Sequence, residues 1–261
     1  MEGNLLAWLR LSAWRMPVLR PYGFVHLLLL FVVSPFLGVL AWRLKRLKER
    51  TIDWILFWIG MVLILSEVYK ELFLSYVIEG RYCYADFPFQ LCSMPMYLCP
   101  FVLFLDKAKR NVCYLFLGSF NFLGGIAAVL EPSSSFYPYM TMTIHSVLWH
   151  QVLLFIGFLL WFSGLCQMDW VVFKKASFLY LFFCGIAYVL NALLMERSGG
   201  VMNLYFIGPG EAPIMVMDWV SAHWGAVPET FLMIGITILG SGILGLGCKW
   251  LIDFVTRPIY N

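Results

Sequence analysis

Charged residues are scarce in this sequence, and no repeat or low-complexity segment interrupts it. Charged side chains make up 13% of the 261 residues, about half of the roughly 25% that is usual for a soluble domain. Hydrophobic residues make up 62% and aromatic residues 18%. A soluble core could not enclose so much apolar side chain, whereas the interior and the two interfaces of a bilayer suit both classes. The sequence therefore predicts an integral membrane protein with almost no water-soluble mass.

Several familiar site patterns are also missing. The chain has no Gly-x-Ser-x-Gly and no glycine-rich phosphate loop. The seven cysteines are an odd number, and only Cys83 falls in a predicted outer loop, so we expect no disulfide framework. The net charge is only +3, and the basic residues form short clusters between apolar runs. These features argue against nucleic-acid binding and indicate that the clusters orient the chain in a membrane.

Histidine and carboxylate side chains raise the alternative of a metal site. His145, His150 and a carboxylate are ordinary zinc ligands. Two histidines on one helical face are expected four residues apart, as in H-E-x-x-H, but these two are five apart. We therefore assign no metal ligand and expect no cofactor. We interpret His150 as a packing residue, and Asn121, which lies near two glycines, as a contact between helices.

Six apolar runs are long enough to cross a bilayer, which takes about 20 residues of helix. They are found at residues 22–42, 51–74, 111–130, 138–163, 174–195 and 228–252. The stretch from Pro88 to Leu105 is shorter and carries Pro95 and Pro100. A proline-kinked helix can still cross when neighbouring helices bind the freed carbonyl groups. Counting this stretch as the third helix predicts an all-α fold, a polytopic membrane bundle of seven transmembrane helices.

Lysine and arginine set the predicted orientation, because short cytoplasmic loops hold an excess of them. The opposite loops contain only Arg81 and Arg197. Lys70 lies within a predicted span. The other basic residues after the first span lie in one set of alternate loops and at the C-terminal end: Arg43, Lys45, Arg46, Lys48, Arg50, Lys107, Lys109, Arg110, Lys174, Lys175, Lys249 and Arg257. Assigning this set to the cytoplasm places the N-terminus outside and the C-terminus in the cytoplasm.

Three segments make up the predicted architecture. Residues 1–21 form a leader, in which residues 4–20 mix Leu and Trp with three arginines and are expected to lie as an amphipathic helix in the interface. Residues 22–252 form the seven-helix domain, and residues 253–261 a short cytoplasmic tail. The first apolar run is followed by a basic cluster and no cleavage site, so we expect a retained helix. The connection from Glu196 to Val227 has the length of a lid or site element.

Four side chains from four predicted helices share one depth beneath the outer surface. Polar groups inside a membrane are costly and usually face the interior of a bundle, so each is a functional candidate. At about 1.5 Å per residue, Cys92 and Asn191 lie about one turn, and Glu67 and His145 about two turns, from the outer ends of their helices.

This layer has the side chains needed for nucleophilic acyl transfer. A Cys92 thiolate could attack an ester carbonyl while His145 takes the thiol proton and later protonates the leaving alkoxide. Such a pair needs to lie within hydrogen-bond reach or about one water apart. Asn191 or Glu67 could orient the imidazole. The alternatives remain that Cys92 is buried simply as a small hydrophobe and that Glu67 only neutralises Lys70.

Residues 88–93, P-F-Q-L-C-S, resemble the P-L-H-L-C-S motif of the YwaF-type integral membrane proteins, to which the animal transmembrane protein 164 is related. Other features follow in the same order. Residues 144–146 are similar to a His-Gly pair on a helix of that family, and Asn191 to an Asn that ends the next helix. Residues 202–209, M-N-L-Y-F-I-G-P, resemble its N-Y-M-Y-L-x-x-K-P stretch. The resemblance extends over about residues 50–250.

The resemblance implies a seven-helix protein and, for the animal relatives, a cysteine-dependent acyltransferase that moves a fatty acyl chain from a phospholipid to a lysophospholipid. It makes Cys92 the expected nucleophile and His145 the base. Gln90, Asn203 and Tyr205 join Glu67 and Asn191 as expected orienting or substrate-binding residues.

This chain departs from the family pattern at three positions. Gln90 stands where the motif has His, Ser146 where it has Gly, and Gly208 where it has Lys. Any role that those positions have in headgroup recognition or catalysis must therefore differ here.

We therefore predict a membrane acyltransferase or lipid acyl hydrolase that acts on phospholipid and lysophospholipid through a Cys92 thioester. The alternative is a non-catalytic protein that binds or transports a lipid or small solute at the same polar layer, although the sequence shows no repeat of the kind found in transporters. A short chain without a retention signal favours a bacterial plasma membrane. The sequence does not predict an oligomeric state.

Overall fold

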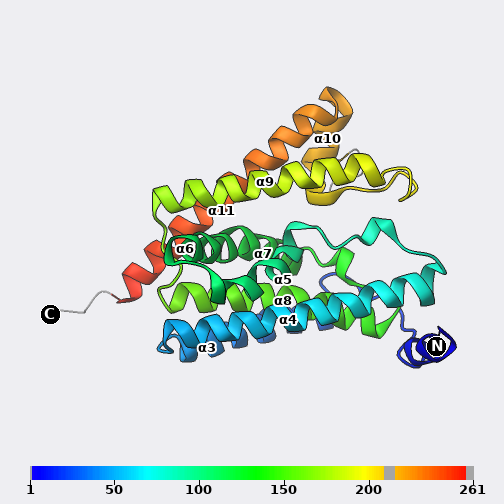
Figure 1. The fold of residues 1–261 in the computed structure, drawn as a ribbon, viewed down its shortest axis with the longest axis horizontal. Coiled ribbons are helices and arrows are strands. Elements are labelled where there is room, and N and C mark those ends of the chain that lie inside the picture. The colour runs from blue at the N-terminus through cyan, green and yellow to red at the C-terminus, as the bar shows by residue number, and fades with distance from the viewer. Residues whose placement is uncertain (1, 209–214, 257–261) are drawn as a thin grey trace.

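The computed structural model describes residues 2–208 and 215–256, and these residues form mostly helices. Six segments are long and apolar enough to cross a membrane, and they lie side by side in one bundle (Figure 1). All six predicted spans are confirmed, with ends displaced by at most five residues. In chain order the segments are Phe24–Leu44, with α2 (Phe24–Leu28), η1 (Leu29–Val33) and α3 (Ser34–Leu44); Glu49–Glu79, with α4 (Glu49–Phe73) and η2 (Leu74–Glu79); Lys107–Leu130, with α6 (Lys107–Leu115), η6 (Phe116–Asn121) and α7 (Phe122–Leu130); α8 (Met140–Phe162); α9 (Trp170–Leu194); and α11 (Ala226–Thr256).

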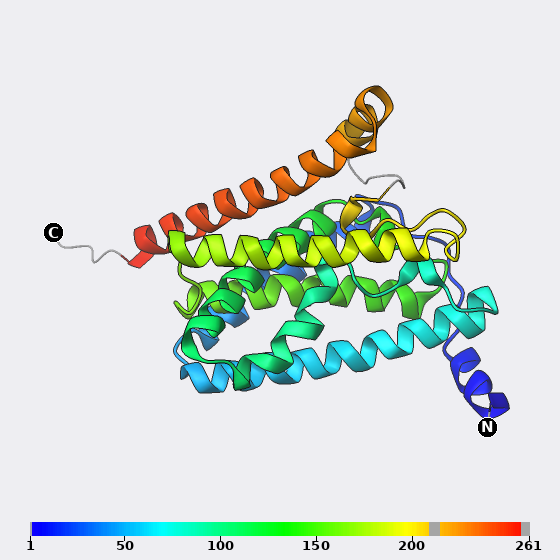
Figure 2. The ribbon, with the colours of Figure 1, turned by 45° about the horizontal axis from the view of Figure 1, so that its top comes forward.

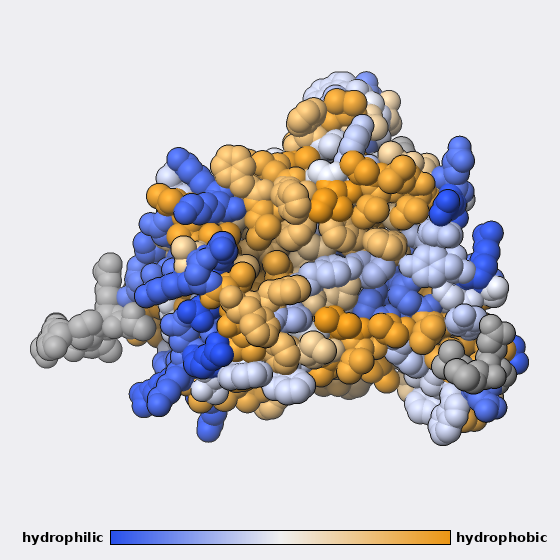
Figure 3. Space-filling view, viewed as in Figure 1, coloured by the Kyte–Doolittle hydropathy of each residue, from blue (hydrophilic) through white to orange (hydrophobic). Residues whose placement is uncertain are grey.

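The outward surface of these segments is apolar. Phe31, Val62, Phe182 and Ile243 come from four different segments and are each more than 60% exposed. Figure 3 shows an apolar band between two more hydrophilic ends of the molecule. A helix that is hydrophobic on its outer face as well as its inner one is typical of a membrane span. A helix also pairs its own backbone N–H and C=O groups, and this is needed because hydrocarbon offers them no hydrogen bonds.

The proline-containing stretch is the exception among the apolar segments. It forms a shorter helix, Leu91–Phe104, built from η4 (Leu91–Ser93), α5 (Met94–Leu98) and η5 (Cys99–Phe104), of which η4 and η5 are 3₁₀ turns. The nitrogens of Pro95 and Pro100 carry no hydrogen atom, so they donate no hydrogen bond to the carbonyl groups one turn before them. A Cβ atom on Gly60 would lie 2.5 Å from Pro100 Cδ, so η5 packs directly on α4.

The chain path places α1 (Glu2–Leu11) and the C-terminal end of α11 at opposite ends of the bundle. Figures 1 and 2 show that α4 and α6 both start at the end where α11 finishes, so residues 80–106 return the chain along the bundle between them. Figure 3 shows a strongly hydrophilic surface at this end, where α4 and α6 begin with the sequences E-R-T and K-A-K-R. We refer to it as the basic end, and to the other as the outer end.

The leader contains a shorter helix than the one expected over residues 4–20. Helix α1 (Glu2–Leu11) ends at Leu11, and the chain is irregular up to α2. The leader is tied to the outer end of the bundle, because Ser12 Oγ lies 2.6 Å from Tyr69 Oη and Thr141 Oγ1 donates to the Ser12 carbonyl at 3.0 Å. Arg15 forms an isolated β-bridge with Tyr139. These bonds hold residues 12–15 against α4 and the start of α8, so these residues do not continue α1 as one long interfacial helix.

Two further boundaries differ from the sequence prediction. The expected tail 253–261 continues α11 as far as Thr256, and residues 257–261 lie outside the described residues. The expected loop 196–227 contains the 3₁₀ turn η8 (Leu204–Phe206) and the helix α10 (Met215–Trp224), which packs against α11. Residues 209–214 lie outside the described part. The connection is therefore a folded element over much of its length.

A buried ion pair joins α4 to α6 at the basic end. Asp53 is fully buried, and its Oδ2 atom lies 2.9 Å from Arg110 Nη1. Tyr114 donates a hydrogen bond to the other carboxylate oxygen of Asp53. Arg110 also pairs with Glu49 at 3.2 Å. A buried charge without its partner is costly, so this group fixes how α6 sits against α4.

We predict that Asp53→Ala lowers the stability of the protein by about 3 kcal/mol or more, because it leaves the mostly buried Arg110 guanidinium without its closest partner. For a chain of this size the apparent Tm in detergent should fall by about 5–10 °C. Lys109→Ala is the matched control, because it removes the exposed pair with Asp106 and should leave the Tm unchanged. An equal Tm for Asp53→Ala and the wild type would show that the pair does not hold the two helices together.

Candidate functional site

Three ionisable side chains meet between α4 and α8 toward the outer end. Glu67 Oε1 lies 2.5 Å from Lys70 Nζ, and Glu67 Oε2 lies 3.9 Å from His145 Nε2. All three side chains are less than 20% exposed. Glu67 is therefore paired with Lys70, as one of the sequence-based alternatives expected. It also lies beside the imidazole of His145.

Lys70 is surrounded by more acceptors than one ammonium neutralises. Besides Glu67, its Nζ atom lies 3.5 Å from Glu71 Oε1 and donates to the Asp86 carbonyl at 3.3 Å. Two carboxylates thus share one ammonium.

The Nε2 atom of the His145 imidazole is buried and makes no hydrogen bond to any of the described residues. Glu67 Oε2, at 3.9 Å, lies beyond hydrogen-bond distance. The Cys92 thiol is therefore not hydrogen-bonded to this atom. Buried polar atoms are nearly always paired, and an unpaired one is a candidate for a chemical role.

Cys92 lies in η4, at the start of the short helix, and the residue as a whole is intermediate in exposure. Its carbonyl accepts a hydrogen bond of 2.9 Å from Trp149 Nε1 on α8. The Trp149 ring in turn lies 5.4 Å from the His145 ring at an interplanar angle of 31°. Trp149 therefore contacts both candidate catalytic residues: it binds the backbone of Cys92 and packs against the ring of His145.

A second buried side chain binds the same segment. Asn121, at the end of η6, donates a 2.5 Å hydrogen bond to the Leu91 carbonyl. The sequence suggested only a contact between helices for this residue. Asn121 and Trp149 thus bind two consecutive carbonyl groups around the cysteine. The contact between helices expected of Asn121 is confirmed, whereas the sequence analysis missed Trp149. A Trp four residues after His145, on the same helical face, was the available signal.

The side-chain amides of Gln90 and Asn191 bind the chain segment 203–205. Gln90 accepts a bond of 2.7 Å from the Tyr205 amide and donates one of 3.0 Å to the Asn203 carbonyl. Asn191 accepts a bond of 2.7 Å from the Leu204 amide and donates one of 3.1 Å to its carbonyl. The structure therefore directs the Asn191 amide to Leu204 and not to the imidazole. We call this arrangement the amide clamp.

The clamped segment has an unusual backbone. Tyr205 and Phe206 have φ angles of 56° and 54°, which non-glycine residues adopt rarely and at a cost of about 1–3 kcal/mol each. Tyr205 is 3% exposed and packs against Tyr180 and Phe89, while Asn203 is partly buried. The segment therefore lies against the bundle, and the clamp offsets its backbone strain.

Gly208 has a structural reason to differ from the lysine of the family motif. Its amide donates a 2.7 Å hydrogen bond to Asn203 Oδ1. A Cβ atom at this position would lie 2.9 Å from the Met202 carbonyl oxygen and 3.0 Å from Asn191 Nδ2. Only glycine fits here without displacing the amide clamp.

Cys83, in the loop at the outer end, does not have the surroundings of a nucleophile. Its Sγ atom donates to Asp86 Oδ2 at 3.1 Å. Burial, together with this hydrogen bond and the charge of Asp86, raises the pKa of the Cys83 thiol to about 11. The thiol is therefore protonated at neutral pH, and thiolate chemistry is not expected from it.

Within residues 2–208 and 215–256, no three His, Cys, Asp or Glu side chains gather closely enough to hold a metal ion. His150 binds the Ser146 carbonyl of its own helix through Nδ1 at 2.8 Å.

Comparison with known proteins gives one match. A family model described as the TMEM164 family matches residues 21–240, which is most of the chain. No curated protein and no solved structure matches.

We predict that Asn191→Leu releases residues 203–208, because it leaves the buried amide and carbonyl of Leu204 without partners, at about 1–3 kcal/mol each. Amide hydrogen exchange in this segment should accelerate relative to the wild type. Gln167→Leu removes one bond of an exposed amide and serves as the control. Unchanged exchange in Asn191→Leu would show that the clamp does not hold the segment.

Proposed function

Because the chain belongs to the TMEM164 family, we propose that it is a membrane phospholipid acyltransferase in which Cys92 carries the acyl group and His145 acts as general base. The substrates are a phospholipid donor and a lysophospholipid acceptor. The observation that carries the proposal is the unpaired Nε2 atom of a buried His145 beside Glu67, with Trp149 linking that imidazole to the Cys92 backbone.

In the first half-reaction, Cys92 Sγ attacks the carbonyl carbon of the ester, and His145 Nε2 takes the thiol proton. The bond between the carbonyl carbon and the glycerol oxygen breaks. The proton passes from the imidazolium to that oxygen, and a lysophospholipid leaves. In the second half-reaction, the hydroxyl of the acceptor attacks the thioester carbonyl and gives its proton to His145. The bond between the carbonyl carbon and Cys92 Sγ breaks, the new phospholipid leaves, and the imidazolium returns the proton to the sulfur.

The neighbouring charges assist the proton transfers. Glu67, at 3.9 Å from Nε2, stabilises the imidazolium that forms in each half-reaction. Lys70 holds the Glu67 side chain in place through its 2.5 Å ion pair. The fixed position of the Cys92 carbonyl on Trp149 limits the movement of the nucleophile, which favours reaction by holding it in one geometry.

The alternative function is non-catalytic binding or transport of a lipid or small solute. The same polar layer could hold a headgroup near the broken helix Leu91–Phe104. The lack of a hydrogen bond between Nε2 of His145 and the thiol favours this alternative. A competent base commonly tightens its contacts only when substrate is bound, so we retain the acyltransferase as the conclusion.

We also propose that the protein crosses the membrane seven times, with Leu91–Phe104 and the residues before it as the third crossing. The path of the chain supports this, because α4 and α6 begin at the same end of the bundle (Figure 1). By the lysine and arginine excess, the basic end faces the cytoplasm, which puts the N-terminus outside. The membrane we propose is a bacterial plasma membrane.

We predict that Cys92→Ser abolishes acyl transfer from phospholipid to lysophospholipid, because an alcohol at this position is a far weaker nucleophile than a thiolate. Thin-layer separation of labelled lipid products measures the transfer, and size-exclusion chromatography checks folding. Cys99→Ala, in the buried part of the same helix, should transfer as the wild type does. Wild-type transfer by a folded Cys92→Ser would exclude Cys92 as the nucleophile and favour the binding protein.

The topology predicts the side from which new cysteines react. In a Cys83→Ser background, Lys48→Cys and Lys107→Cys should be modified by a membrane-impermeant thiol reagent in inside-out vesicles but not in intact cells. Arg81→Cys should show the reverse pattern. Modification of Lys48→Cys or Lys107→Cys in intact cells would contradict the orientation.

A further inference from the structure

We propose that an apolar groove along α4 binds the acyl chain of the lipid substrate, with the carbonyl end of the chain at Cys92 and its methyl end toward the basic end of the bundle. This inference rests on the proposed function, and it adds where the chain lies and what limits its length.

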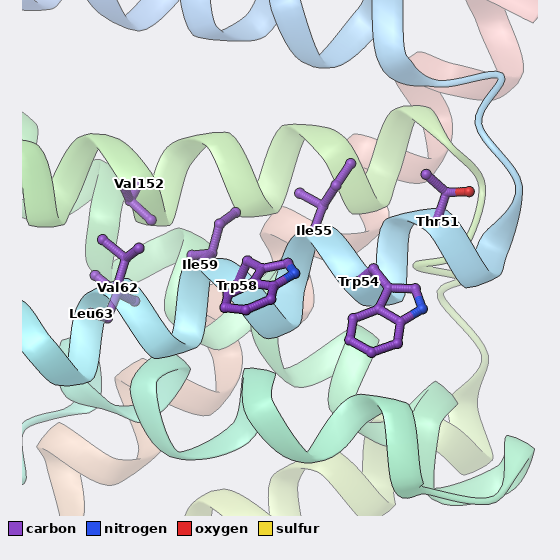
Figure 4. A pocket seen from close by; sticks show the side chains of 8 residues that line it. All are labelled: Thr51, Trp54, Ile55, Trp58, Ile59, Val62, Leu63 and Val152. Carbon is purple, nitrogen blue, oxygen red and sulfur yellow. The ribbon is translucent and has the colours of Figure 1, made fainter.

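The groove has a volume of about 450 Å³, within the roughly 300–1,000 Å³ of pockets that hold small ligands. One face of α4 lines it from Thr51 to Leu63, and Val152 of α8 closes one side (Figure 4). Among its lining side chains only Thr51 and the two indoles carry a polar atom. Such a lining offers nothing to a charged or polar ligand and suits a hydrocarbon chain.

The groove joins the surroundings of Cys92. Leu63 belongs to a buried cluster with Met96, Trp149 and Leu153, and Cys92 packs against that cluster. Ile59 and Val152 line the groove and pack against the same cluster. One end of the groove is therefore continuous with the side chains that surround the nucleophile.

The length of the groove matches a membrane acyl chain. Thr51 and Leu63 are 12 residues apart, which is about 18 Å along a helix. The chains of one leaflet fill about half of a hydrocarbon core of about 30 Å, or roughly 15 Å. A long-chain acyl group thus fits along the groove with little left over.

The order of polar and apolar groups along α4 also matches a phospholipid. Glu67 and Lys70 lie toward the outer end, and the groove begins one turn deeper, at Leu63. A phospholipid has the same order, with its charged headgroup and ester outside and its chain inside. Trp58 is 61% exposed and leaves the groove open sideways, so a chain can enter from the surrounding lipid.

The test is the chain-length preference of acyl transfer in two variants that fill the groove at different depths. Ile59→Trp blocks it one helical turn beyond Leu63, and Ile55→Trp blocks it two turns beyond. The ratio of transfer from octanoyl to palmitoyl donors should rise by about tenfold or more in Ile59→Trp, because a pocket discriminates strongly against methylenes that it cannot hold. The rise should be smaller in Ile55→Trp. Leu65→Trp, on the lipid-facing side of α4 and 66% exposed, is the control and should keep the wild-type ratio.

A second measurement separates the groove from the catalytic proposal. A phospholipid with a diazirine at the end of one chain should crosslink to residues 51–59 of the wild type, and Ile59→Trp should lose this crosslink. If the wild type transfers no acyl group but crosslinks in this way, the acyltransferase is wrong and the groove stands. Wild-type ratios in both groove variants would overturn the groove while the acyltransferase stands. If the wild type transfers no acyl group and the crosslinks are spread evenly over α4 and the exposed face of α9, both the acyltransferase and the groove are overturned.

Discussion

Hydrocarbon offers no hydrogen bonds, so each polar group inside the membrane must find its partner within the protein. The segment around Cys92 shows how this constraint shapes the site. Asn121 and Trp149 bind two consecutive carbonyl groups there, and Gln90 binds residues 203 and 205. The partners come from three other parts of the chain. The prolines that interrupt this short helix are thus compatible with a defined geometry, because other segments hold it.

The same constraint identifies where chemistry can occur. Glu67 and Lys70 satisfy each other's charge, and the amides of Gln90 and Asn191 are used on backbone groups. His145 Nε2 remains buried and unpaired beside that ion pair. A general base needs a free lone pair. The groups already paired in this layer therefore have structural roles, and His145 is the candidate for proton transfer. The apolar groove then continues from the same layer toward the basic end.

Hydropathy alone predicted the six long helices, because each apolar run has to match the thickness of the bilayer. Depth along the helices also brought Glu67 and His145 together correctly. Depth fixes only one coordinate, however, and the rotation of each helix about its axis decides what a side chain meets. Asn191 has the predicted depth, yet its amide binds Leu204. Asn121 and Trp149 bind carbonyl groups that lie 30 and 57 residues away in the sequence. Local patterns could indicate that each residue makes a contact, but not which carbonyl group it binds.

The central claim is that Cys92 carries the acyl group as a thioester. Mass spectrometry of the purified protein after incubation with a phospholipid donor tests it most directly, without an acceptor to discharge the intermediate. A single acyl adduct that maps to Cys92 and is removed by neutral hydroxylamine is the predicted result. No adduct, or an adduct on another cysteine, would contradict the claim.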